Sequence, residues 1–183
     1  IRLSLVGSEM CIRDSFTTPG SAIIVPTPAY MPFLLVPPMH DRRVIEVPSI
    51  EVDGRWVMDL DAVAQAFRDG GEMLVLCNPH NPLGTVATRD ELLAIASVVT
   101  DAGGRVFSDE IHAPIVYAPA QHIPYASVSE AAASHTLTAT SASKAWNLAG
   151  LKCAQVILSN DADAALWAVS YTHLRAHETK ANL

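Results

Sequence analysis

Lys144 stands in a setting that suits the capture of a carbonyl group. It belongs to the stretch from Ser141 to Lys152, in which small and hydroxyl side chains precede it and a glycine follows. A lysine amine attacks a carbonyl only when it is at least partly deprotonated, and a desolvated pocket or a nearby cation promotes that state. Ser141 and Ser143 could hold an anionic group beside the amine. Taken alone, the pattern also fits a solvated surface lysine, so its meaning depends on the residues that accompany it.

Asp109 is the first of these residues. It follows the apolar run Arg105–Ser108, so we expect it at the end of a buried strand, where a carboxylate needs a partner. The protonated ring nitrogen of pyridoxal phosphate would be such a partner, and the ring could then accept an electron pair. His112 would reach the same ring edge if the segment turns helically. The alternatives are a helix N-cap for Asp109 and an ordinary packed histidine for His112.

Two further segments carry groups that could contact a cofactor. The segment Asn78–Gly84 contains two prolines, two asparagines and a glycine, which fits either a rigid loop that offers hydrogen bonds from Asn81 or an ordinary turn. Tyr30 follows a proline-rich turn and could lie against a planar ring, although a packed tyrosine is the commoner case. Three other aromatic residues are interpreted as packing residues: Trp56, Tyr117 and Trp146.

The candidate residues follow predicted strands. Apolar runs predict strands over 21–25, 43–47, 73–77, 105–108, 135–139 and 153–158, with a turn at Pro26-Thr-Pro28 after the first. Helical spacing predicts one helix over 59–69 and another that opens with a capping box at Thr88–Glu91 and stops before Gly103. Strands alternating with helices indicate an α/β sheet that is mainly parallel, and ligands of such sheets bind beyond the carboxyl ends of the strands. Asn81, Asp109 and Lys144 are therefore expected on one rim.

Composition favours a protein that binds a small metabolite. Of the 183 residues, 50% are hydrophobic and 17% charged, and the net charge is -7 with no basic stripe, which argues against nucleic acid and anionic membranes as partners. No apolar run approaches the ~20 residues of a membrane helix. Without a convincing signal peptide, a cytoplasmic location is expected. The spacing of the three cysteines and of the histidines predicts neither a disulfide nor a metal site.

The two ends of the chain break the pattern of the middle. Residues 1–15 and 169–183 resemble translated adapter sequence of the kind found at the ends of gene models. We therefore predict one partial domain over 16–168 between two non-native segments. His173 and His177 are four residues apart, but they receive no metal-binding role because they lie in the second of these segments.

In combination and in this order, the motifs resemble the large domain of the fold-type I pyridoxal-phosphate enzymes, the aminotransferase class I/II superfamily. Three stretches most resemble the cystathionine β-lyase (MalY/PatB) group of carbon–sulfur lyases: Pro28–Phe33, Ser108–His112 and Ser141–Leu151. The resemblance implies a three-layer α/β/α fold with a mainly parallel sheet, here as part of the large domain of a pyridoxal-phosphate-dependent transferase fold.

The resemblance also implies a role for the residues around the pyridine ring. Lys144 would form the Schiff base with the cofactor and later move the substrate Cα proton. Asp109 would pair with the pyridinium nitrogen. Asn81, helped by His112, would hydrogen-bond the phenolic oxygen, and Tyr30 would stack on the ring.

Three further residues would hold the cofactor phosphate. The resemblance places Ser141, and with it Ser143, at the phosphate. Lys152 occupies the position at which many transaminases have a phosphate-binding arginine. A lysine keeps the positive charge but loses the bidentate fork of arginine.

The whole enzyme would be a homodimer that cleaves sulfur amino acids such as cystathionine to a thiol, pyruvate and ammonia. Family members are longer, with an upstream glycine loop, a tyrosine from the dimer partner and a C-terminal domain whose arginine grips the substrate carboxylate. We therefore expect the chain to be an internal fragment with little turnover by itself. Two alternatives stay open: an aminotransferase of class I/II, and a non-catalytic aminotransferase-like domain.

Overall fold

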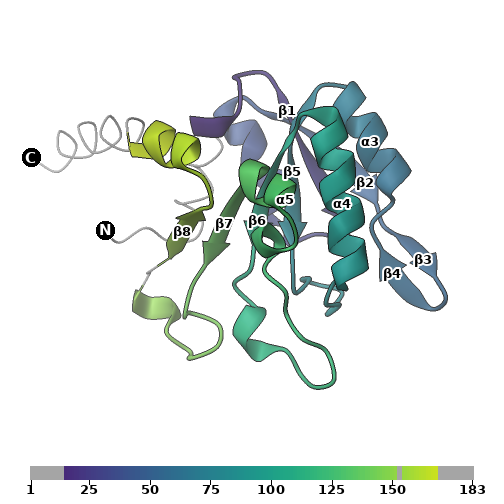
Figure 1. The fold of residues 1–183 in the computed structure, drawn as a ribbon, viewed down its shortest axis with the longest axis vertical. Coiled ribbons are helices and arrows are strands. Elements are labelled where there is room, and N and C mark those ends of the chain that lie inside the picture. The colour runs from purple at the N-terminus through teal and green to yellow at the C-terminus, as the bar shows by residue number, and fades with distance from the viewer. Residues whose placement is uncertain (1–14, 152–153, 169–183) are drawn as a thin grey trace, which may run out of the picture.

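A six-stranded sheet forms the centre of the computed structural model, which describes residues 15–151 and 154–168 (Figure 1). Its strands lie in the order β2-β1-β5-β6-β7-β8. Neighbouring strands are parallel except for β8, which runs antiparallel to β7. The bounds are β1 Ala22–Thr27, β2 Arg43–Pro48, β5 Gly71–Cys77, β6 Arg105–Asp109, β7 Thr136–Thr140 and β8 Gln155–Leu158. The predicted α/β fold with a mainly parallel sheet is confirmed.

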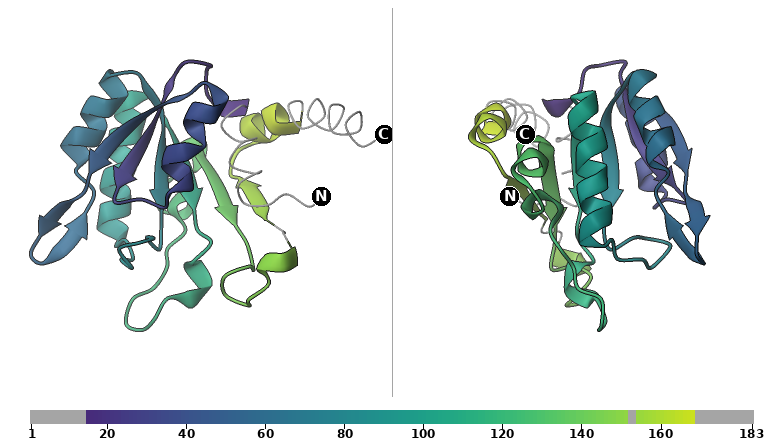
Figure 2. Two further views of the ribbon diagram at one scale, coloured as in Figure 1. Left: turned by 180° about the vertical axis from the view of Figure 1, so that it is seen from behind. Right: turned by 45° about the vertical axis from the view of Figure 1, so that its right-hand side comes forward.

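Helices lie on both faces of this sheet. Figures 1 and 2 show α3 (Leu60–Arg68), α4 (Arg89–Ala102) and α5 (Glu130–His135) on one face and α2 (Pro32–Leu35) on the other. A separate two-stranded hairpin, β3 (Ile50–Val52) and β4 (Arg55–Val57), projects at one side. The 3-10 helices are η1 Pro37–His40, η2 Ala113–Ile115, η3 Tyr125–Ser127 and η4 Ala149–Leu151. In the part of the chain that the structure describes, no helix is long and apolar enough to cross a bilayer.

The central strands divide their side chains between two cores. Leu74 and Val106 belong to the cluster packed against α3, α4 and α5. Met73 and Phe107 belong to the cluster on the opposite face. Successive side chains of a strand point to opposite faces, and both faces are covered here. This explains why the strands appear in the sequence as continuous apolar runs.

Helix α4 begins and ends where the sequence predicts. The Thr88 side chain accepts a hydrogen bond from the amide of Glu91, and the Glu91 carboxylate accepts one from the amide of Thr88 at 2.6 Å. Gly103 ends the helix in the left-handed conformation, with φ of 63°, which glycine adopts without a Cβ penalty. The face predicted to be buried is confirmed: Leu92, Ile95, Ala96 and Val99.

Several predicted boundaries are wrong: β8, for example, begins at Gln155, and Ala154 before it is not in the strand. Strand β1 continues through Pro26 to Thr27 instead of turning at Pro26. It pairs with β5 only over Ala22–Ile24, so beyond that point it has a strand on one side only, and a missing amide hydrogen is tolerated there. Strand β7 begins at Thr136, because His135 is the last residue of the short helix α5, which Ser129 caps.

The interpretation of three aromatic residues as packing residues is also wrong. Trp56 is 45% exposed, Trp146 61% and Tyr117 87%. Trp56 belongs to the projecting hairpin β3–β4, whose sharp turn at Asp53 and Gly54 has positive φ at both residues. Tyr117 lies in the connection between η2 and η3, and Trp146 in the one between β7 and η4. Connections of this kind run over the surface, where an aromatic side chain finds fewer packing partners.

Candidate active site at the carboxyl edge of the sheet

The carboxyl ends of β5, β6 and β7 meet at one level of the sheet. Cys77 pairs with Asp109, and Asp109 pairs with Ala139 in the strand register. Beyond the ladder, the amide of Asn78 donates to the carbonyl of Asp109 at 3.0 Å, and the amide of Glu110 donates to the carbonyl of Ala139 at 2.9 Å. These bonds fix the exits of the three strands relative to one another. The predicted common rim is therefore present.

Asp109 is a buried carboxylate at the centre of this rim. Its exposed fraction is 2%, and its Oδ1 accepts a hydrogen bond from the amide of Ile111 at 3.1 Å. Burial is the main reason that the pKa of Asp109 is raised to about 6. The hydrogen bond from the Ile111 amide lowers the pKa, the neighbouring Glu110 charge raises it, and the charge of Lys144 lowers it. A carboxylate at this position gains from a cationic partner. The structure thus places Asp109 where an additional positive group would stabilise its charge.

Lys144 and His112 lie within electrostatic reach of each other at the same rim. Lys144 is exposed, and His112 is half-buried. Burial, followed by the charge of Lys144, lowers the pKa of His112 below its usual value, and a hydrogen bond with the backbone of Pro79 opposes this. Because the Lys144 charge also acts on Asp109, three of the predicted site residues come together. The bond to Pro79 further connects His112 to the loop that carries Asn81.

Ser141 and Ser143 form a small hydroxyl cluster ahead of Lys144. Their Oγ atoms lie 2.6 Å apart, and the amide of Ser143 donates to Oγ of Ser141 at 3.1 Å. Ser141 is buried and Ser143 half-buried. Hydroxyl and amide groups that converge in a tight turn are suited to an anionic oxygen.

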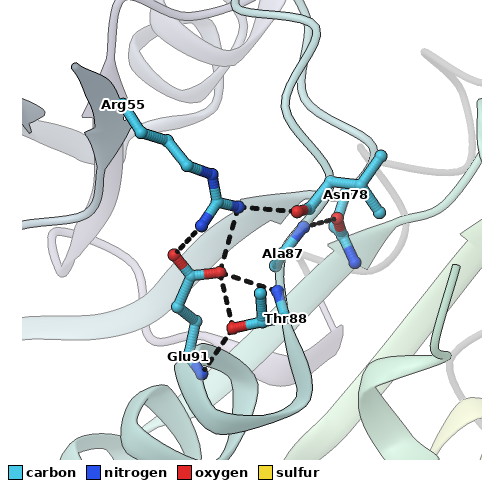
Figure 3. A network of polar contacts seen from close by, with 6 residues as sticks. Arg55, Asn78, Ala87, Thr88 and Glu91 are labelled. Atoms are coloured by element: carbon cyan, nitrogen blue, oxygen red, sulfur yellow. Dashed lines mark hydrogen bonds and ion pairs between the residues drawn. The ribbon is translucent and has the colours of Figure 1, made fainter. Parts of the chain in front are cut away.

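Asn81 belongs to a loop that is anchored from both sides (Figure 3). The Asn78 side-chain oxygen accepts from the amide of Ala87 at 3.0 Å, which closes the loop, and Arg55 donates to the carbonyl of Val86 at 2.7 Å. Arg55 also makes a two-pronged ion pair with Glu91 at the start of α4. The hairpin β3–β4 thus holds the loop from outside. Asn81 itself is half-buried and lines a small cavity of about 20 Å³ together with Ala29.

Tyr30 is not brought to the site by any contact found among the described residues. The Tyr30 ring is 38% exposed and meets the ring of Phe33 edge-on, with centroids 5.6 Å apart. Its neighbour Ala29 shares the small cavity with Asn81, so Tyr30 lies near the loop. Lys152 falls outside the described residues, as do Cys11, Cys153, His173, His177 and residues 1–14 and 169–183.

A cavity of about 390 Å³ lies beside this rim. Residues of the hairpin, of the loop after β5 and of α4 line it, among them Trp56, Leu83 and Ala94. Asp109, His112 and Lys144 are not among its lining residues. Within residues 15–151 and 154–168, no group of three or more histidine, cysteine or acidic side chains is arranged to hold a metal ion.

Sequence reasoning missed a second polar cluster, around Glu110. Its carboxylate accepts hydrogen bonds from Ser108 Oγ at 2.9 Å and from the amide of Tyr125 at 3.0 Å, and it pairs with His122 Nε2 at 2.9 Å. The Tyr125 hydroxyl in turn meets His135 Nε2 at 2.9 Å. The available signal was a second carboxylate next to Asp109, since two acidic residues at a buried strand end need separate partners.

Comparison with known proteins shows which family this chain belongs to. The family model of aminotransferase class I and II matches residues 8–175. The chain belongs to the aminotransferase class I and II family. The family predicted from the motifs is confirmed, and with it the fold.

Individual relatives support the same placement. The chain is 46% identical over 154 residues to cystathionine beta-lyase of Corynebacterium glutamicum, covering 84% of this chain and 40% of that protein. The structure of cystalysin from Treponema denticola, which contains pyridoxal 5'-phosphate, matches with a TM-score of 0.87 at 30% identity, over 93% of this chain and 43% of that one. N-succinyldiaminopimelate aminotransferase from Mycobacterium tuberculosis matches with a TM-score of 0.82 at 27% identity, over 91% and 43%. The chain thus spans about 40% of the length of this cystathionine beta-lyase, which is one of the curated relatives that it matches.

Proposed function

We propose that the chain is the cofactor-binding part of a pyridoxal-phosphate-dependent carbon–sulfur β-lyase of the cystathionine β-lyase type. The observation that carries the proposal is the buried Asp109 carboxylate with the Lys144 amine within electrostatic reach. The identity of 46% to a cystathionine beta-lyase supports the choice of reaction.

The chemistry of the donor set fits pyridoxal phosphate. Asp109 is a buried acceptor whose charge a pyridinium nitrogen would stabilise. Lys144 supplies an exposed amine for the aldehyde, and Ser141 and Ser143 supply hydroxyl and amide donors for the phosphate. Asn81 and His112 would approach the phenolic oxygen from the neighbouring loop. In this assignment Tyr30 covers the ring and Lys152 neutralises the phosphate.

Each residue then has a defined task. When bound, the cofactor supplies a ring that delocalises the electron pair left by breaking the substrate Cα–H bond. Asp109 would hold the ring nitrogen in its protonated form, because the negative charge of the carboxylate stabilises the positive charge of the protonated nitrogen. Lys144, once free of the cofactor, accepts the Cα proton at Nζ. His112 has a lowered pKa, so at neutral pH it offers an uncharged ring for hydrogen bonding.

The substrate in this proposal is a sulfur amino acid whose β-carbon carries the leaving thiolate, such as cystathionine. The products are a thiol, pyruvate and ammonia. An aminotransferase of class I/II is the second candidate, because Asp109, Lys144 and Asn81 would serve both reactions up to proton removal. The structural match to N-succinyldiaminopimelate aminotransferase supports this second candidate.

The reaction is tested on the complete polypeptide, because the chain spans about 40% of its curated relative. Purified complete enzyme is incubated with cystathionine and the cofactor, with and without an added keto acid. A lyase releases free thiol and pyruvate in equal amounts without the keto acid. Keto-acid-dependent turnover without thiol release would contradict the lyase assignment and favour the aminotransferase. The Lys144→Ala enzyme is expected to be inactive in either case.

The cellular setting is part of the same proposal. We place the complete enzyme in the cytoplasm as a homodimer. The exposed apolar side chains beyond the carboxyl edge support an association between copies, among them Tyr117, Trp146 and Leu151. We also retain the proposal that residues 16–168 are the genuine domain and that 1–15 and 169–183 are non-native. Sedimentation of the complete enzyme at several concentrations tests the dimer.

A further inference from the structure

The side chain of Glu110 points to the face of the sheet opposite to that of Asp109. Side chains alternate along an extended chain, so Asp109 and Glu110 point to opposite faces, and Glu110 lies on the face of Ser108. The bond from Ser108 Oγ to Glu110 Oε1, at 2.9 Å, agrees with this. The side chain of Glu110 is 6% exposed and that of His122 is 11% exposed. A carboxylate this deeply buried is stable only where hydrogen bonds or an ion pair replace its contacts with water.

The bonds of Glu110 join both ends of a long rim segment. Its amide donates to Ala139 of β7 at 2.9 Å, which fixes the start of the segment. Its Oε1 accepts from the amide of Tyr125 at 3.0 Å, and its Oε2 pairs with His122 Nε2 at 2.9 Å, which fix the end. Tyr125 is fully buried in the core below α4 and α5. Glu110 therefore closes the segment 111–124 at its base.

The segment itself is exposed between these anchors. Figures 1 and 2 show 111–124 and 141–151 projecting beyond the edge at which β6 and β7 end. Ile115 is 43% exposed and Tyr117 87%. His112 lies two residues after Glu110, at the start of the segment. The charge of Lys144 is close enough to lower the pKa of His112. The direction in which the segment leaves Glu110 thus contributes to the position of His112, together with the bond from the Ile111 amide to Asp109 and the bond of His112 with the backbone of Pro79.

We propose that Glu110 is a positioning residue, which together with His122 braces the segment 111–124 and thereby holds His112 beside Lys144. The consequence for catalysis rests on the proposed function, whereas the brace itself does not. His122 Nδ1 is buried and has no hydrogen-bond partner among the described residues. The bond to Glu110 is consequently the one that holds the imidazole ring in this part of the chain, and its loss releases the end of the segment.

The test compares Glu110→Ala, Glu110→Gln and His122→Ala with the unchanged 183-residue chain and with the exposed control Glu46→Ala. Two quantities are measured without cofactor: the pKa of His112, by NMR of histidine-labelled chain, and the rate of proteolytic cleavage within 113–121. His112→Asn identifies the resonance. A general loss of stability does not move the pKa of His112 in the molecules that remain folded, whereas displacement of the segment does.

The brace predicts a different result for each variant. In Glu110→Ala the pKa of His112 rises toward 6.5, because His112 leaves its buried place beside Lys144, and cleavage becomes about tenfold faster or more, since bonds to a charged group are lost. Glu110→Gln keeps an acceptor for Ser108 and Tyr125 but places an NH2 group where Oε2 pairs with His122, so it gives a smaller shift than Glu110→Ala, whereas Glu46→Ala stays near the unchanged chain. His122→Ala gives a smaller shift in the same direction. If Glu110→Ala does not fold, the result for His122→Ala tests the brace instead.

Two outcomes would overturn the brace: an unchanged pKa of His112 and unchanged cleavage in His122→Ala, or the same result in folded Glu110→Ala. The covalent labelling of Lys144 by pyridoxal phosphate is measured on the same proteins. If the parent chain is not labelled although the variants show an intact brace, the proposed function is contradicted and the brace is not. If the parent chain is labelled but Glu110→Ala gives the same His112 pKa and cleavage rate as the parent, the brace is contradicted and the proposed function is not.

Discussion

Replacing Asp109 with asparagine should make the folded chain more stable at neutral pH. The pKa of this carboxyl is raised from 3.8 to about 6 in the folded chain, chiefly by burial. The folded state therefore binds the proton more tightly than the unfolded state does. The stability linked to this group is fully present below about pH 4 and is lost as the pH rises through about 6.

The size of the effect follows from the pKa difference. A shift of about 2 units, at about 1.36 kcal/mol per unit, corresponds to about 3 kcal/mol of stability lost at pH 7. Asparagine carries no charge and keeps an oxygen that can accept the bond from the Ile111 amide. The variant should therefore match the parent near pH 4 and exceed its free energy of unfolding by up to about 3 kcal/mol at pH 7.

Urea unfolding followed by tryptophan fluorescence from pH 4 to 8 measures this difference. The exposed Asp101, replaced by asparagine, serves as the matched control. This variant removes one carboxylate at the surface and leaves the buried Asp109 in place. A constant difference between Asp109→Asn and the parent over the same range would refute the reasoning, because the carboxylate would then cost nothing in its buried place.

Other predictions concern the elements that position the site. Gly104→Ala brings a Cβ into steric overlap with the edge of the Phe67 ring, so the urea midpoint should fall by the equivalent of about 1–3 kcal/mol. An unchanged midpoint would mean that the ring moves aside without cost. Thr88→Ala removes the N-cap of α4 and should cost about 1 kcal/mol, with Thr100→Ala, exposed on the same helix, as the comparison. Arg55→Lys keeps the charge but loses the two-pronged bond to Glu91, so proteolytic cleavage at the β3–β4 turn should accelerate; cleavage at the parent rate would contradict the role given to Arg55.

The sequence was informative where local patterns are strong. The capping box of Thr88 and the apolar run before Cys77 determine α4 and β5 by local rules. The place of Asp109 followed from the same logic, because a carboxylate after a continuous apolar run comes at the end of a buried strand. Contacts between distant residues were not accessible in this way. The pairing of Glu110 with His122 depends on how a long segment returns to the sheet.

The hairpin β3–β4 shows the same limit. The pair Asp53-Gly54 is a local turn signal, but the anchor of the hairpin is Arg55, whose bonds reach Val86 and Glu91 far along the chain. The exposure of Trp56 follows from this arrangement, because the hairpin projects from the sheet. Residue type alone suggested a buried tryptophan, and the tertiary contacts decided otherwise.

The central claim is that Lys144 is the amine that receives the cofactor, and covalent trapping tests it most directly. The chain contains three lysines: Lys144, Lys152 and Lys180. Purified protein is incubated with pyridoxal phosphate, reduced with borohydride, digested and mapped by mass spectrometry. We expect the label on Lys144, its loss in Lys144→Ala and a weaker label in Asp109→Asn, which removes the partner of the ring nitrogen. Label spread over Lys152, Lys180 and the N-terminus with none on Lys144 would contradict the claim.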